Sequence, residues 1–249
     1  MGFSVLGVRP SARDVFPDDP LVQQLVHAAR KGRVKKVHAL VAQGADPNLI
    51  GTEEMTPMVF VAARRGSKKG FAALLAAGAD PNYIDSRGRC LAGVFANASD
   101  PYWLRVMLDN GLNPDLRSSG NPLLINAILN DNGEPHVQML LAAGADINQR
   151  SGGGKTALMT LVQLSRWEEA LMLLEQGADP WFVANTGGTV GWQCHKARPI
   201  TGRLASYEEF RGRLEEMGVP IPGPSPEDIR QRWKEFGKFD RLPNDEREL

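Results

Sequence analysis

The sequence of 249 residues has few cysteines, no excess of charge of either sign and no long apolar run. Its two cysteines, Cys90 and Cys194, are far apart, which argues against a disulfide framework. The 29 basic and 29 acidic residues cancel, so the chain lacks the net positive charge typical of nucleic-acid-binding proteins. A disulfide-stabilised domain and a strongly basic nucleic-acid binder are therefore not expected.

Segments that target or insert a chain into a membrane are not evident either. No window approaches the roughly 18 consecutive apolar residues of a spanning helix. Residues 1–20 lack a basic region followed by an apolar run, the pattern of a signal peptide. Hydrophobic residues make up 42% and charged residues 23%, as in folded globular proteins. We expect a cytoplasmic protein, or a periplasmic one if a signal peptide has been removed.

A five-residue motif that begins with glycine recurs along the chain. Its first residues are 34, 33, 33 and 33 positions apart, and a weaker copy, Gly218 to Pro222, follows after 41. The five clear copies are Gly44-Ala45-Asp46-Pro47-Asn48, Gly78-Ala79-Asp80-Pro81-Asn82, Gly111-Leu112-Asn113-Pro114-Asp115, Gly144-Ala145-Asp146-Ile147-Asn148 and Gly177-Ala178-Asp179-Pro180-Trp181. This constant period indicates a repeat architecture.

Each copy of the motif is preceded by two segments that the pattern predicts to be helical. The nearer one has apolar residues at helical spacing, such as Phe71, Leu74 and Leu75. The motif glycine then suits the left-handed conformation that ends a helix. The more distant segment begins with a polar cap, and the clearest examples start at Thr56-Pro57, Asn121-Pro122 and Thr156-Ala157.

A unit of turn, helix, loop and helix at this period resembles the ankyrin repeat, over roughly residues 19–222. The resemblance implies an all-α solenoid of about five to six helix-turn-helix repeats. It departs from the family in its Thr-Pro-Leu-His signature, which survives best as Thr56-Pro57-Met58-Val59 without the histidine. The expected repeats are 19–48, 49–82, 83–115, 116–148, 149–181 and a degenerate 182–222.

Both ends of the repeat region are expected to be atypical caps, because an end repeat has one face without a neighbour. Asp19-Pro20 starts the first helix after an N-terminal segment, residues 1–18. Residues 223–249 form a C-terminal capping helix and tail, in which Ser225-Pro226-Glu227-Asp228 is a capping box. This helix carries Trp233 and Phe236 and is expected to close the stack.

Ankyrin repeats bind other proteins, so the resemblance implies a non-catalytic protein-binding module. It places the variable residues at the end of each first helix and in the finger loop after each motif. At the helix ends stand Arg30-Lys31 and Arg64-Arg65, and Lys35, Lys36, Lys68 and Lys69 follow nearby. Later repeats carry Asp131, Glu134, Glu168 and Glu169 at the corresponding region.

The neutral total therefore hides two halves of opposite sign. The first hundred residues hold 13 basic and 9 acidic residues, and the remaining 149 hold 16 and 20. Scattered surface charges are usually only solvated. The two matched arginine-containing pairs repel one another, however, unless an acidic surface faces them, so we expect a protein partner with an acidic patch.

The finger loops supply the other candidate partner-binding residues, several of them aromatic or arginine as in interface hot spots. They are Ile50, Glu53, Glu54, Tyr83, Arg87, Arg117, Arg150, Trp181 and Phe182. Trp181 and Phe182 have two interpretations: they anchor a partner, or they pack under the irregular sixth unit.

Catalytic and cofactor-binding patterns are weak. Gly152-Gly153-Gly154-Lys155-Thr156 resembles the end of a phosphate-binding loop, but Gln149 stands where that loop needs glycine and no strand precedes it. Cys194 and His195 are neighbours in sequence, and such side chains generally point apart. His27, His38 and His136 lack metal-ligand spacing. We expect no enzyme, no cofactor and no metal site.

Nucleic acid is the main electrostatic rival to a protein partner, but no aromatic platform accompanies the basic pairs. In its irregular fingers, long sixth unit and ending, the chain resembles single-domain bacterial ankyrin proteins, many of which are immunity proteins for secreted toxins, including type VI effectors. This implies an inhibitor that occludes a toxin's active site. The alternatives are a general scaffold or regulatory adaptor, and an accessory domain that modulates an enzyme.

Overall fold

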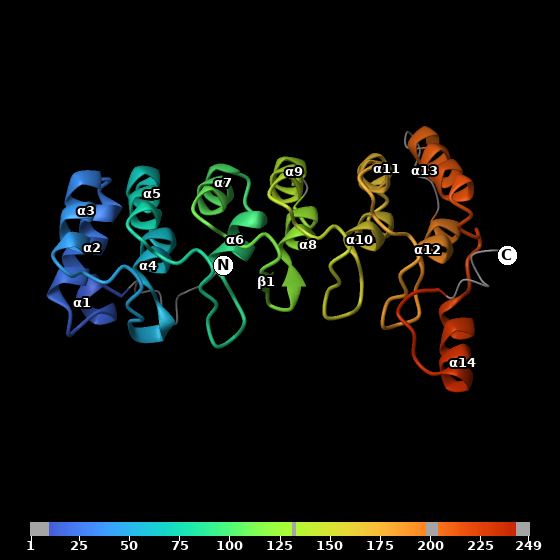
Figure 1. Cartoon of the computed structure of the whole chain (residues 1–249), viewed down its shortest axis with the longest axis horizontal. Coiled ribbons are helices and arrows are strands. Elements are labelled where there is room, and N and C mark those ends of the chain that lie inside the picture. The colour runs from blue at the N-terminus through green and yellow to red at the C-terminus, as the bar shows by residue number, and fades with distance from the viewer. Residues whose placement is uncertain (1–9, 131–132, 198–203, 243–249) are drawn as a thin grey trace. The chain divides into compact units, whose positions relative to one another are not determined.

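The computed structural model describes residues 10–130, 133–197 and 204–242 (Figure 1). This part of the chain is mostly helical, as the sequence analysis expects. It forms two compact units. The first holds residues up to 95 together with 100–116, and the second holds 96–99 and the chain from 117 onward.

The first unit contains three pairs of short helices preceded by a single turn of helix. The elements are α1 (Ala12–Val15), α2 (Pro20–Arg30), α3 (Val34–Ala42), the 3-10 helix η1 (Thr52–Glu54), α4 (Pro57–Ala63), α5 (Lys68–Ala76), α6 (Leu91–Ala96), whose last residue falls in the second unit, and α7 (Tyr102–Asp109). The Asp19 carboxylate caps α2 by accepting the Val22 N–H at 2.8 Å. Val22, Leu25 and Val26 of this helix are fully buried, so one face of α2 belongs to the core.

Neighbouring helix pairs in the first unit pack at very short range. Gly70 lies in α5 against the backbone of α2, and a Cβ atom built on it would stand 1.7 Å from the Ala29 carbonyl oxygen. No residue larger than glycine fits there without moving one helix. The aromatic rings of Phe71, Phe95 and Trp103 continue this core, with centroids 5.2 to 5.7 Å apart.

The second unit repeats the paired arrangement and begins with the short antiparallel hairpin β1–β2. The elements are β1 (Arg117–Ser118), β2 (Asn121–Pro122), α8 (Leu123–Ile128), α9 (Glu134–Ala142), α10 (Ala157–Gln163), α11 (Trp167–Glu175), α12 (Val190–Lys196), α13 (Leu204–Glu216) and α14 (Pro226–Phe236). Thr156 caps α10 through its hydroxyl, as predicted. Asn121 does not cap α8, because it pairs with Ser118 in the hairpin and Pro122 takes the cap position.

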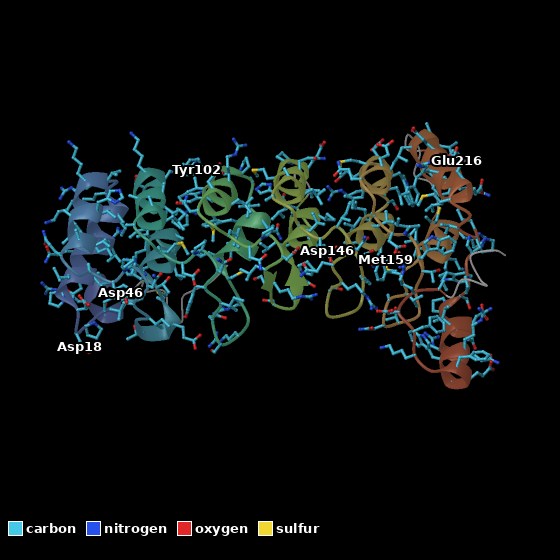
Figure 2. All side chains as sticks on the ribbon, viewed as in Figure 1. Asp18, Asp46, Tyr102, Asp146, Met159 and Glu216 are labelled. Atoms are coloured by element: carbon cyan, nitrogen blue, oxygen red, sulfur yellow. The ribbon has the colours of Figure 1, made fainter. Side chains whose placement is uncertain are left out.

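The recurring motif forms the same turn in all five copies. Its glycines have φ between 89° and 100°, the left-handed region predicted for a helix end. The third residue of each copy accepts the backbone N–H two positions later at 2.8 to 2.9 Å, so Asp46 and Asp146 stand at equivalent turns (Figure 2). The motif is therefore a helix stop joined to an Asx turn.

The asparagine that ends the motif links successive turns within each unit. Asn48 donates to the Gly78 carbonyl at 2.8 Å and accepts the Asp80 N–H at 2.7 Å. Asn82 makes the equivalent bonds to Gly111 and Asn113, at 3.0 and 2.7 Å. In the second unit Asn148 accepts the Asp179 N–H at 2.8 Å. These bonds set the spacing of the turns.

The N-terminal end of the first unit extends further than the sequence analysis expects. Val15 and Phe16 belong to the N-terminal segment 1–18, which is expected from the sequence to lie outside the repeats, and both are buried. The Phe16 ring meets the Phe60 ring edge to face at 5.9 Å, and the Thr52 hydroxyl donates to the Asp14 carbonyl at 3.0 Å. Residues 1–9 lie outside the described residues. The helix α1 thus covers the first pair.

The C-terminal end of the second unit is covered in two places. The sixth pair, α12–α13, ends the helical side, and Tyr207 and Phe210 of α13 pack on the buried Trp167 ring at 5.1 and 5.7 Å. The capping box at Ser225 is confirmed. However, α14 lies on the loop side (Figure 1), where its Ile229 packs with Val183 and Leu242. It covers a loop rather than the helical end face.

Replacement of Gly70 by alanine tests the close approach of α5 to α2. We expect Gly70→Ala to lower the free energy of unfolding by about 3 kcal/mol, because the methyl group overlaps a carbonyl oxygen. The matched control is Gly212→Ala in α13, where a Cβ atom has no neighbour within 4 Å. It is expected to raise stability by about 0.5 to 1 kcal/mol. Urea denaturation followed by circular dichroism measures both, and similar effects of the two variants would contradict this packing.

Replacement of Asn82 by alanine tests the link between turns. Asn82→Ala removes one donated and one accepted hydrogen bond, and we expect a loss of about 1 to 2 kcal/mol of unfolding free energy. Asn97→Ala is the control, because Asn97 is exposed and its side chain makes no hydrogen bond among the described residues. Its expected effect is below about 0.5 kcal/mol. Equal denaturation midpoints for the two variants would show that the link contributes nothing.

Candidate functional site

The residues that close five of the first helices differ in their chemistry. These C-cap positions are Lys31 after α2, Arg64 after α4, Leu129 after α8, Leu164 after α10 and Ala197 after α12. They are cationic in the first unit and apolar in the second. Leu129 and Leu164 are 49% and 44% exposed, and no pattern in the sequence marks them as surface residues.

The two cationic pairs differ in how they are held. Arg30 and Lys31 are exposed at the end of α2. The end of α2 meets the start of α5, where the Ser67 N–H donates to the Arg30 carbonyl at 3.2 Å. Arg64 is half-buried, with its guanidinium carbon 4.5 Å from the centre of the Phe60 ring. Arg65 is exposed and has a left-handed φ of 50°. Arg64 therefore has a packing role besides its charge.

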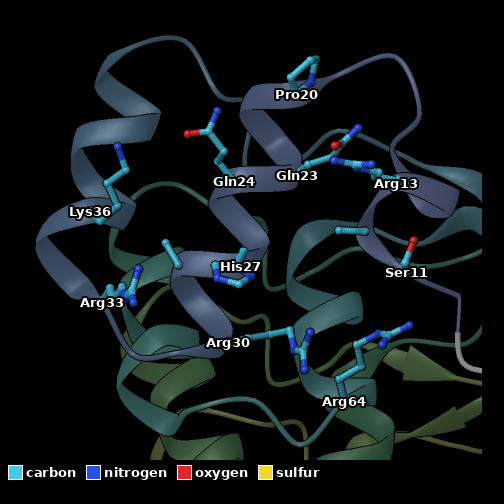
Figure 3. Close-up of a pocket in the computed structure, with 12 residues that line it drawn as sticks. Ser11, Arg13, Pro20, Gln23, Gln24, His27, Arg30, Arg33, Lys36 and Arg64 are labelled. Atoms are coloured by element: carbon cyan, nitrogen blue, oxygen red, sulfur yellow. The ribbon is translucent and has the colours of Figure 1, made fainter.

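Arg30 and Arg64 share a hollow with cations that the sequence analysis did not group with them. The hollow has a volume of about 700 Å³ and is lined from α1, α2, α3 and the end of α4 (Figure 3). We name it the cationic pocket and define it by Arg13, His27, Arg30, Arg33, Lys36 and Arg64. The constant repeat period predicts that the ends of α2 and α4 lie side by side. It does not predict that side chains of α1 and α3 also reach the pocket, because that depends on the tertiary fold.

The charges of the cationic pocket influence the pKa values of His27 and Asp14. The pKa of His27 is lowered by partial burial and then by the charges of Lys31, Arg33 and Arg30. The pKa of Asp14 is lowered chiefly by hydrogen bonds from Ser11, with a smaller contribution from Arg64. His27 is therefore neutral near pH 7, and the cationic pocket holds five full positive charges.

The finger candidates of the first unit are divided between exposed and structural residues. Ile50 is 58% exposed, and Glu53 and Arg87 are exposed. Glu54 accepts the Ser86 N–H at 2.8 Å, which together with the Ser86 hydroxyl lowers its pKa. The Tyr83 hydroxyl donates to the Glu54 carbonyl at 3.0 Å. Glu54 and Tyr83 thus hold adjacent fingers together.

The finger candidates of the second unit are mostly engaged within the chain. Arg150 donates to Gly154 and Val183 carbonyls at 3.1 and 2.9 Å and forms a 2.6 Å ion pair with Asp240. Trp181 packs against the cluster of Val183, Ile229 and Leu242, which matches the second of its two interpretations.

Phe182 and Arg117 occupy the remaining finger positions of this unit. Phe182 forms a β-bridge with Arg241, whose guanidinium lies over its ring. Arg117 is exposed and donates to the Gly120 carbonyl at 3.2 Å. Arg150, Trp181 and Phe182 therefore hold the C-terminal segment in place.

The acidic residues named in the later repeats have different surroundings. Glu169 pairs with Arg166, while Glu134 and Glu168 are exposed. Asp131 lies outside the described residues.

The residues considered for catalysis have ordinary surroundings. Burial raises the pKa of Cys194 to about 11, so its thiol stays protonated near neutral pH. In the glycine-rich segment the Lys155 ammonium donates to the Gln163 side chain at 2.6 Å. His38 is exposed and His136 is buried. Among the described residues, no group of three or more His, Cys, Asp or Glu side chains is arranged to hold a metal ion.

None of the helices in the described ranges combines the length and apolar character needed to cross a membrane.

Part of the chain is similar to a known protein. No family model matches the chain. A stretch of 70 residues is 43% identical to the 2-5A-dependent ribonuclease of Homo sapiens, and it covers 28% of this chain and 9% of that protein. The ribonuclease contains ankyrin repeats, so the match supports an ankyrin-repeat relationship for part of this chain and suggests a protein-interaction module.

The titration of His27 tests the potential of the cationic pocket. We expect Arg30→Gln with Arg33→Gln to raise the pKa of His27, because two of the charges that oppose its protonation are removed. Since the folded pKa is lowered, the stability contributed by neutral His27 is present above the unfolded pKa of about 6.5 and is lost as pH falls. The imidazole resonances followed by NMR from pH 5 to 8 measure the shift. Arg87→Gln is the control, and an unchanged His27 pKa in the double variant would contradict the assignment.

Proposed function

We propose that this chain is a non-catalytic, ankyrin-repeat protein-binding module that inhibits a partner by covering a negatively charged surface on it. The observation that carries the proposal is the concentration of positive charge between Arg30 and Lys69. This stretch holds nine cationic and three acidic residues. The three acids lie outside the α-helices: Asp46 is in the turn, and Glu53 and Glu54 are in the 3-10 helix η1 of the finger. Such an arrangement suits an acidic partner.

The separation between residues that pack and residues that are exposed also supports a binding function. Apolar side chains of each helix pair are used for packing, while the helix ends and finger loops carry exposed and chemically varied residues. Repeat proteins recognise partners through such surfaces. Arginine is favoured at interfaces because its planar guanidinium forms two parallel hydrogen bonds with a carboxylate.

The partner that we propose is a bacterial toxin, for which this chain serves as the immunity protein. A row of arginines on a rigid support is suited to block a toxin whose active cleft is lined by carboxylates. Inhibition then comes from occlusion of the active cleft. A toxin of the type VI secretion class is the specific case that the resemblance of the sequence favours.

A scaffold or regulatory adaptor is the second candidate, and the exposed leucines favour it. Leu129 and Leu164 occupy in the second unit the positions that are cationic in the first. A chain with one cationic and one apolar set of helix ends offers surfaces of different chemistry, which suits the binding of two partners.

Charge reversal at the exposed pair tests the proposal. Arg30→Glu with Lys31→Glu is expected to weaken the complex by about 2 to 3 kcal/mol, or about 30- to 150-fold, and to slow association. The partner for the measurement is the recombinant protein encoded beside this chain's gene, and binding is followed by calorimetry and stopped-flow kinetics. This pair is preferred to Arg64 and Arg65, because reversal at Arg64 would also disturb its packing on Phe60.

The control for charge reversal is Arg105→Glu, on the exposed side of α7 and without an ion pair among the described residues. It is expected to leave affinity within about twofold. If the neighbouring protein has no toxic activity, or if this chain binds it without protecting cells, the immunity role is excluded. If affinity is the same for the charge-reversed variant and the wild type, the acidic-surface proposal fails.

A further inference from the structure

The cationic pocket gathers positively charged side chains from several elements of the first unit around one hollow. Arg33, the residue before α3, and Lys36 of α3 lie on one side of His27, and Arg64 and Arg13 lie on the other side (Figure 3). The described residues that line it include no carboxylate. Positive charges from three directions thus converge on one hollow, where a single anionic segment meets several of them at once.

Few interactions within the chain offset this charge. In the described ranges, Arg13, Arg30, Arg33 and Lys36 take part in no ion pair. The carboxylate closest in sequence, Asp14, is used by the capping box, in which it accepts the Ser11 N–H at 2.6 Å. Like charges held together without counterions destabilise the folded chain slightly, and a bound anion relieves that repulsion.

The chemistry of the lining favours a peptide over a nucleic acid. Four of the five cations are arginine, which matches the planar geometry of carboxylates. Gln24 adds an exposed amide that offers a donor and an acceptor to a peptide backbone. The lining contains no Phe, Tyr or Trp, so it lacks the platform on which single-stranded nucleic acids stack their bases.

We propose that the cationic pocket binds a contiguous acidic segment of the partner protein, with Arg33 and Lys36 on one wall and Arg30 and Arg64 on the other engaging successive Asp or Glu side chains. This inference rests on the proposed function and specifies its partner: the recognised feature is a short run of carboxylates that enters the hollow. The segment acts as an anchor, and the surrounding surface adds contact area.

Binding of fluorescein-labelled hexaglutamate tests this inference without knowledge of the partner. Anisotropy titration at about 50 mM salt is expected to show saturable binding to the wild type, and binding weakens as salt is added. Lys36→Glu and Lys35→Glu form a matched pair, since the two lysines are adjacent and exposed on α3 but only Lys36 lines the pocket. We expect about tenfold weaker binding for Lys36→Glu and less than about threefold for Lys35→Glu.

A second readout is local to the pocket. Saturating hexaglutamate is expected to raise the pKa of His27, because bound carboxylates offset the neighbouring positive charges. Arg33→Glu changes another residue of the pocket wall and is expected to weaken hexaglutamate binding as much as Lys36→Glu does. Circular dichroism checks that both variants are folded.

Three results would overturn the inference. The first is equal weakening of peptide binding by Lys35→Glu and Lys36→Glu, which would indicate diffuse electrostatic attraction. The second is an unchanged pKa of His27 when the peptide is saturating. The third is tighter binding of hexathymidylate than of hexaglutamate, which would indicate a nucleic-acid partner. The outcome is separable from that of the proposed function. If the partner binds and hexaglutamate does not displace it, the proposed function stands but the pocket is not the anchor. If hexaglutamate binds in the pocket and no partner complex forms, the pocket stands as an acidic-peptide site and the proposed function fails.

Discussion

The packing of one helix pair on the next is the interaction on which the rest of this structure depends. A pair such as α4–α5 is too small to bury its own apolar face, and the face is covered only when a neighbouring pair supplies the other half of the core. The contact is close enough that Gly70 is required where α5 meets α2. Because stability comes from these buried faces, the residues at the helix ends and in the loops are left to vary with function.

The turns serve the same packing by fixing the distance between pairs. Each motif glycine stops a helix, the following Asp or Asn shapes the turn, and Asn48, Asn82 and Asn148 link one turn to the next. These side-chain hydrogen bonds connect successive turns within each unit. With the spacing fixed, side chains at equivalent positions of adjacent pairs lie on the same side of the unit, which is how the ends of α2 and α4 form a single cationic surface.

The two ends of the chain use polar and aromatic residues for closure. In the first unit, α1 places Phe16 on Phe60 and brings Arg13 to the cationic pocket, so the cap also takes part in the proposed site. In the second unit, Arg150 and Trp181 hold the segment around Leu242 against the loops. Arginine and tryptophan are typical of binding interfaces, but Arg150 and Trp181 contact the C-terminal segment of the same chain.

The sequence by itself determined the helical class, the period, the helix stops and the caps at Asp19, Thr56, Thr156 and Ser225, because each of these depends on local backbone preferences and short-range hydrogen bonds. It also singled out the basic helix ends. Only the tertiary structure decided that Asn121 enters a hairpin, that α14 covers a loop, that Arg150 is engaged while Arg30 is exposed, and that Arg13, Arg33 and Lys36 share a pocket with Arg64. These outcomes depend on contacts between residues far apart in the chain, and local sequence patterns do not predict which distant side chains will be in contact.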